Sequence, residues 1–173
     1  MQGSIEIDSE VGKGSTVQVT LPIRINEAWS EQPVDDARNL HNNVAGMRVL
    51  LVEDNEINCE IMEFMLRDAG AETVTANDGK AAVDAFAASE PGTFDCVLMD
   101  LMMPVMSGYE ATRVIRSLDR SDAKTVPIIA LSANAFEEDV TMAKDAGMNE
   151  HLAKPVDMGK MFKLMSRLKR SMT

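Results

Sequence analysis

Cysteine, basic charge and long apolar runs are all scarce in this chain of 173 residues. Cys59 and Cys96 form no CxxC pair and fall in a predicted helix and a predicted core strand, so we expect reduced thiols rather than a disulfide or a metal site. The formal net charge of −11 argues against unaided binding to nucleic acid or to an anionic membrane. No apolar run reaches membrane-spanning length and no secretory leader pattern opens the chain, so we expect a soluble, cytoplasmic protein.

Short apolar runs alternate with amphipathic stretches from residue 47 onward, a pattern typical of a parallel sheet covered on both faces. The pattern predicts five strands, near 48–53, 72–76, 94–99, 127–132 and 150–153. It predicts five helices, at about 56–69, 79–88, 107–118, 135–146 and from 157 onward. These β/α units give an α/β fold with a doubly wound, five-stranded parallel sheet.

Helix periodicity also predicts which side chains share a face. The first helix carries an apolar stripe of Ile57, Ile61, Met65 and Ala69. Ser107 and Glu110 have the spacing of a capping box, so the third helix should begin there. The third and last helices are expected to place these apolar residues in the core: Ala111, Val114, Ile115, Leu118, Met158, Met161, Phe162, Met165 and Leu168.

Residues 1–46 differ in kind from the rest of the chain. Apolar and polar residues alternate over 3–21 around Gly12 and Gly14, which predicts two strands joined by a glycine turn. Residues 26–46 are polar and lack sustained periodicity, so we interpret them as a linker. The predicted organisation is a β appendage at 1–25, a linker at 26–46 and the α/β domain at 47–173.

Charged and hydroxyl side chains stand at the ends of four predicted strands. Glu53 and Asp54 follow the first, Asp100 the third, and Lys154 the fifth, while Ser132 ends the fourth. If these strands are parallel neighbours, the side chains meet at the sheet edge where open α/β folds bind ligands. Three crowded carboxylates need a cation, and oxygen ligands favour Mg²⁺ or the similar Mn²⁺. Such a pocket suits a phosphoryl group bridged by the metal.

Each of these assignments has a simpler alternative when taken singly. Glu53 and Asp54 could cap the first helix, Lys154 and Asp100 could form an ordinary ion pair, and Ser132 could be a strand-end hydroxyl. Their joint placement at four strand ends favours a functional site.

Four motifs within residues 47–170 resemble those of two-component receiver domains. They are LVEDNEIN at 51–58, LMDLMMPVMSGYE at 98–110, ALSAN at 130–134 and HLAKP at 151–155. The resemblance implies a flavodoxin-like sheet with strand order 2-1-3-4-5 and Asp100 as the phosphoacceptor. The implied metal ligands are Glu53, Asp54, Asp100 and the backbone carbonyl of Met102.

The same resemblance assigns roles to the remaining site residues. Lys154 would pair with the phosphate when it is present and with Asp100 when it is absent, and Ser132 would donate to the phosphoryl oxygens. Ser132 and His151 would be the switch residues, with His151 at a position where receivers usually carry Tyr or Phe. The Lys154–Pro155 bond is expected to be cis.

Residues 3–22 resemble the closing strands of a histidine-kinase ATP-binding domain. The matching residues are Ser9, Gly12, Gly14, Ser15, Thr16, Leu21 and Pro22. An unrelated hairpin is the alternative. A remnant of that domain directly before a receiver implies the C-terminal part of a hybrid sensor histidine kinase.

The resulting hypothesis is a phosphorelay receiver. Asp100 would accept phosphate, with Mg²⁺, from a phosphohistidine-bearing kinase or a histidine phosphotransfer domain. We expect no kinase activity beyond self-phosphorylation and dephosphorylation, and no contact with nucleic acid or directly with a membrane, although a parent kinase could be membrane-anchored. The alternatives are a stand-alone response regulator acting by protein contact and a flavodoxin-like cofactor binder, which the negative charges of Glu53, Asp54 and Glu56 oppose.

Overall fold

The structure is a computed structural model that describes residues 3–10, 12–20, 22, 44–133 and 137–170. The chain divides into two units, residues 1–34 and residues 35–173. Most of the predicted linker, and residues 135–136 of the predicted fourth helix, lie outside the described residues. No helix within the described ranges is both long and apolar enough to cross a membrane.

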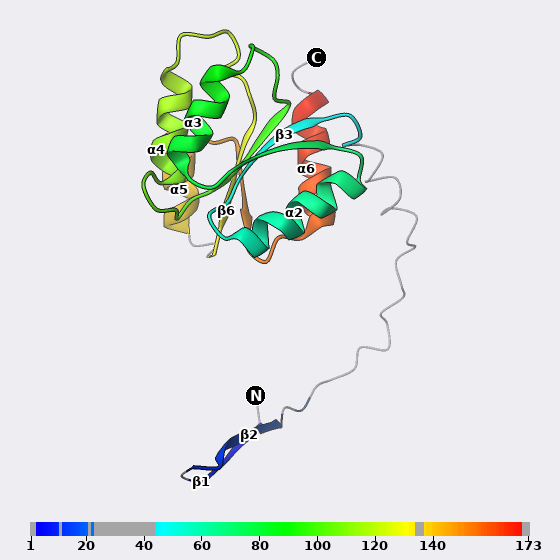
Figure 1. The fold of residues 1–173 in the computed structure, drawn as a ribbon, viewed down its shortest axis with the longest axis vertical. Coiled ribbons are helices and arrows are strands. Elements are labelled where there is room, and N and C mark those ends of the chain that lie inside the picture. Colours follow the sequence, from blue (N-terminus) through cyan, green and yellow to red (C-terminus); the bar gives the residue numbers. More distant parts are fainter. Residues whose placement is uncertain (1–2, 11, 21, 23–43, 134–136, 171–173) are drawn as a thin grey trace. The chain divides into compact units, whose positions relative to one another are not determined.

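The larger unit is built on five parallel strands (Figure 1). They are β3 (Arg48–Val52), β4 (Glu72–Ala76), β5 (Cys96–Asp100), β6 (Ile128–Ser132) and β7 (Glu150–Ala153), in the order β4-β3-β5-β6-β7. Counted within this unit, the order is 2-1-3-4-5, which confirms the prediction. β5 begins two residues later than the predicted strand and includes Asp100 itself.

Five helices cover the two faces of this sheet (Figure 1). They are α2 (Glu56–Asp68), α3 (Gly79–Ala88), α4 (Gly108–Ser117), α5 (Glu137–Ala146) and α6 (Met158–Arg170). α3, α4 and α5 supply Phe86, Ile115 and Ala143 to one buried cluster, whereas α2 and α6 supply Leu66 and Phe162 to the other. The doubly wound architecture is therefore confirmed.

The three central strands, β3, β5 and β6, are buried on both faces because their side chains alternate between these two clusters. Leu50 and Val52 of β3 pack with α3, α4 and α5, while Val49 and Leu51 pack with α2 and α6. The sequences of such strands are continuous apolar runs, without the alternation of apolar and polar residues seen in half-exposed strands. Cys96 is fully buried in β5, as expected.

The helix faces agree with the prediction except in α2. The predicted residues of α4 and α6 are buried or partly buried in the core. In α2, however, the side chains that are buried are Met62 and Leu66, while Ile57 and Ile61 are 68% and 57% exposed. The predicted stripe is therefore exposed at its first two residues, half-buried at Met65 and buried at Ala69, because the sheet and α6 pack against the neighbouring face of the helix.

The smaller unit contains an antiparallel hairpin of β1 (Ser4–Glu10) and β2 (Gly14–Thr20). Ile5 lies opposite Val19 and Ile7 opposite Val17, and all four are exposed. Gly12 in the connecting turn has a φ of +82°, a conformation that glycine adopts at little cost. The predicted pair of strands around a glycine turn is confirmed.

Candidate functional site

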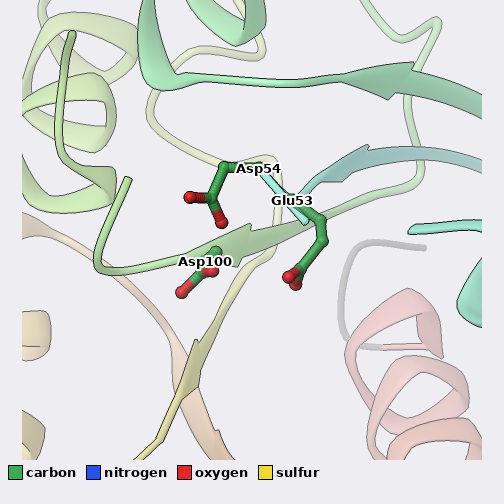
Figure 2. Close-up of side chains that lie close together, drawn as sticks. All are labelled: Glu53, Asp54 and Asp100. Atoms are coloured by element: carbon green, nitrogen blue, oxygen red, sulfur yellow. The ribbon is translucent and has the colours of Figure 1, made fainter. Parts of the chain in front are cut away.

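The parallel sheet brings the predicted site residues to one edge. β3 and β5 are in register so that Val52 lies beside Met99, and Ser132 of β6 lies beside Ala153 of β7. Glu53, Asp100 and Lys154, which directly follow Val52, Met99 and Ala153, therefore lie with Ser132 at the carboxyl edge of the sheet. Figure 2 shows Glu53, Asp54 and Asp100 gathered there.

The three carboxylates form a compact cluster of oxygen donors. One carboxylate oxygen from each of Glu53, Asp54 and Asp100 lies within 4.8 Å of the others. Glu53 and Asp100 are buried, at 2% and 5% exposure, whereas Asp54 is exposed to solvent. A set of hard oxygen ligands open on one side fits Mg²⁺, which keeps several waters and takes few protein carboxylates. When bound, such an ion neutralises charge on phosphoryl oxygens.

Lys154 bridges the two buried carboxylates. Its Nζ donates to Glu53 Oε2 at 2.6 Å and to Asp100 Oδ2 at 2.7 Å. Burial alone would lower the pKa of Lys154, but its hydrogen bonds to Asp100 and Glu53 outweigh burial and raise that pKa. Three carboxylates and one ammonium leave a net negative site, so the lysine does not replace a divalent cation.

The start of α2 places the first two carboxylates. Asn55 is the N-cap residue, and its side chain accepts a hydrogen bond from the Asn58 backbone N–H at 3.1 Å. The Asn58 side chain then reaches back, and its Nδ2 donates to Glu53 Oε1 at 3.0 Å. Asn58 is not among the predicted site residues, although a side-chain amide in the first helical turn after an acidic pair is a signal that the sequence carries.

The β5–α4 loop places Asp100. The Met102 backbone N–H donates to Asp100 Oδ1 at 3.2 Å, and the Gly108 N–H donates to the Leu101 carbonyl at 3.1 Å. A Cβ atom on Gly108 would lie 2.1 Å from the Asp100 carbonyl oxygen, so only glycine allows this approach. Within the same loop Val105 has a φ of +65° and is 85% exposed.

Ser132 and His151 are brought together by the pairing of β6 and β7. The Oγ atom of Ser132 lies 2.6 Å from Nε2 of His151. Ser132 is buried and His151 is half-buried. The two residues expected to act together as a switch are therefore in direct contact.

An apolar groove of about 520 Å³ adjoins the cluster, with Glu53, Asn58 and Lys154 in its wall. The remaining lining comes from α2, from Ala133 and from the segment that follows β7: Ile61, Met62, Met65, Ala133, Pro155, Val156 and Met158. The Lys154–Pro155 bond at its rim is cis, as predicted.

Comparison with known proteins identifies the larger unit. Residues 49–166 match the family described as "Response regulator receiver domain". The chain is 40% identical over 126 residues to the peroxide stress-activated histidine kinase mak1 of Schizosaccharomyces pombe, covering 71% of this chain and 8% of that protein. It is 35% identical over 160 residues to the aerobic respiration control sensor protein ArcB of Escherichia coli K12, covering 91% of this chain and 19% of that protein.

Among solved structures, the chain resembles the receiver domain of the sensor histidine kinase PA1611 from Pseudomonas aeruginosa PAO1. The TM-score is 0.65 and the identity 40%, over 72% of this chain and 98% of that one. That structure has a magnesium ion coordinated in its active site cleft. The present chain, with its five-stranded parallel sheet and acidic cluster, belongs to the response regulator receiver domain family.

Proposed function

We propose that this chain is the receiver of a phosphorelay and that Asp100 accepts the phosphoryl group. The observation that carries the proposal is the position of Asp100, a buried carboxylate that lies beside two other acids and is held by Lys154 at 2.7 Å. Glu53, Asp54, Asp100 and the Met102 carbonyl would hold Mg²⁺ or Mn²⁺. Buried charged groups gathered at the ligand edge of an α/β sheet are typical of functional sites.

The chemistry needs a positioned acceptor rather than a general base. An oxygen of Asp100 forms a bond to phosphorus while the phosphorus–nitrogen bond of a phosphohistidine breaks, and the donor histidine leaves as the imidazole. Lys154 supplies a positive charge for the new phosphoryl oxygens, and the Ser132 hydroxyl supplies a hydrogen-bond donor. His151, in contact with Ser132 at 2.6 Å, is the residue that would respond to a movement of that hydroxyl.

The apolar surface beside the site supports a protein as the phosphodonor or acceptor. Ile57, Ile61 and Phe64 on α2 are each more than half exposed, and Ile61 continues into the groove beside Lys154. An exposed apolar patch next to a reactive group marks a surface for protein contact. We assign this surface to a phosphohistidine-bearing kinase or a histidine phosphotransfer domain.

We further propose that the chain is the C-terminal part of a hybrid sensor histidine kinase and that β1 and β2 close an ATP-binding domain. Four apolar residues on one face of the hairpin are exposed: Ile5, Ile7, Val17 and Val19. This is expected of two strands that pack against a further layer of structure in a larger domain. The match to ArcB covers 160 residues, more than residues 47–173 contain, so the similarity extends into the N-terminal unit.

Mass spectrometry of the intact protein tests the central proposal. With Mg²⁺ and acetyl phosphate, we expect the mass of one phosphoryl group to appear on the wild-type chain. EDTA should abolish the labelling, and so should Asp100→Asn, which keeps the side-chain size but removes the nucleophilic carboxylate. Metal-independent labelling, or labelling of Asp100→Asn equal to the wild type, would contradict the proposal.

A further inference from the structure

Glu53 is a buried carboxylate whose two oxygens are held by different donors. Lys154 donates to Oε2 at 2.6 Å, and the side-chain amide of Asn58 donates to Oε1 at 3.0 Å. The Glu53 side chain is 1% exposed, so water contributes little to its orientation. The direction in which Glu53 faces the other carboxylates is therefore set by these two contacts.

The two donors differ in charge, and that difference matters for a cation. Lys154 adds a positive charge that a divalent ion must overcome, whereas the amide of Asn58 is neutral. Asn58 can thus orient Glu53 without reducing the negative charge of the cluster. Replacing a partner that orients a metal ligand typically weakens metal affinity by about 10- to 100-fold.

Asn58 is itself fixed in place by the helix that carries it. It is the third residue of α2, and its backbone N–H is held by the Asn55 side chain at 3.1 Å. Because the helix cap fixes the backbone of Asn58, the side-chain amide of this residue is preorganised toward Glu53.

We propose that Asn58 is a positioning residue of the cation site. Asn58 raises the affinity of the site for Mg²⁺ by holding Glu53 through its Oε1 atom. This inference rests on the proposed function, because it requires that the carboxylate cluster binds the metal. Asn58 does not touch the phosphoacceptor and acts only through Glu53.

Calorimetric titration of the full chain with MgCl₂, in the absence of any phosphodonor, measures the effect directly. Asn58→Leu keeps a similar side-chain size and removes the donor, and we expect it to weaken Mg²⁺ binding by about 10-fold or more. Asn58→Gln restores an amide on a longer side chain and should recover part of the affinity. Glu60→Gln, an exposed change on the same helix, is the control and should leave the affinity within about 2-fold of the wild type.

A double-mutant cycle separates positioning from a general effect on the fold. In a Glu53→Gln background, Asn58→Leu should cause no further loss of affinity, because the group that it orients is already altered. If Asn58→Leu does not fold, Asn58→Ser tests the same point, since serine suits a first helical turn but is too short to reach Glu53.

The outcomes distinguish this inference from the proposed function. Wild-type protein that gives no Mg²⁺ binding would overturn the metal site and the inference together. Wild-type binding with an unchanged affinity in Asn58→Leu would overturn the inference alone. A lower melting temperature of the metal-free variant with unchanged Mg²⁺ affinity would show that Asn58 only supports α2.

Discussion

At the scale of single residues, Lys154 decides whether the acidic cluster is tolerable without a metal. Glu53 and Asp100 are buried, and their ammonium partner lies at 2.6 and 2.7 Å from them. Removing one partner of a buried ion pair leaves an uncompensated charge, which costs far more than loss of a surface pair. The lysine is therefore a structural counter-ion as well as a candidate phosphate ligand.

We predict that Lys154→Met lowers the free energy of unfolding by about 3 kcal/mol in the presence of EDTA. Added Mg²⁺ should reduce this deficit, because a cation can neutralise the two buried carboxylates that have lost their ammonium partner. Lys160→Met is the matched control: its pair with Asp157 is at 3.8 Å and both side chains are largely exposed, so the loss should stay below about 0.5 kcal/mol. Urea unfolding of the variants provides the measurement.

The pH dependence of this effect has a defined sign. The pKa of Lys154 is raised above its ordinary 10.5 by hydrogen bonds to Asp100 and Glu53, against the opposing effect of burial. Because the pKa of Lys154 is higher in the folded state, the lysine stabilises the fold fully below pH 10.5. This stabilisation is lost only as the pH rises through the higher pKa of the folded state. The gap between wild type and Lys154→Met should therefore stay constant from neutral pH to about pH 9, and a gap that closes within that range would contradict the ion-pair assignment.

At the scale of elements, the junction between β5 and α4 fixes the backbone of Asp100, the proposed phosphoacceptor. Ser107 and Glu110 form a capping box at the start of α4, as the sequence predicts. The capping box sets where α4 begins, and Gly108, its first residue, then lies directly against the Asp100 carbonyl. The start of α4 and the backbone of Asp100 therefore share one close contact.

We predict that Gly108→Ala destabilises the fold by at least about 2 kcal/mol and slows labelling of Asp100, because a methyl group at 2.1 Å from a backbone oxygen forces the strand or the helix to move. Gly92→Ala is the control. Gly92 has a φ of +81° but nothing within 4 Å of an added Cβ, so that change should cost only about 1 kcal/mol of backbone strain and leave labelling unchanged. Equal effects on labelling would show that the close contact is unimportant.

At the scale of the whole molecule, the larger unit begins before its first strand. Val44 and Met47 are fully buried in the cluster beneath α2 and α6, although they precede β3. The Gly46 N–H donates to the Gly70 carbonyl at 2.8 Å and joins this segment to the end of α2. Residues 44–46 of the predicted linker therefore pack with the larger unit.

Two truncations test this boundary. A chain of residues 35–173 should retain the melting temperature and the Mg²⁺-dependent labelling of the full chain, because residues 1–34 form a separate unit. A chain of residues 48–173 lacks two fully buried apolar side chains and should lose about 3 kcal/mol or more. Thermal unfolding of the two truncated chains measures this difference. Equal stability of the two chains would contradict the prediction.

The sequence alone was enough to predict most of this architecture. Apolar runs of β-forming residues, followed by helices with recognisable caps and glycine stops, specify a doubly wound sheet because local periodicity and turn chemistry agree with the global fold. Glu53, Asp54, Asp100, Ser132 and Lys154 could be identified because each stands at a strand end, and parallel strands bring their ends together whatever the details of packing.

Tertiary structure decided what local periodicity could not. Ile57 and Ile61 form a regular stripe, but the face of α2 that is buried is the one that meets the sheet and α6, which leaves that stripe exposed. The contact of Asn58 with Glu53 depends on where α2 begins, and the contact of Ser132 with His151 depends on the register of β6 against β7. A periodic pattern gives the spacing of side chains along one element, whereas burial and hydrogen-bond partners are set by the neighbours of that element in space.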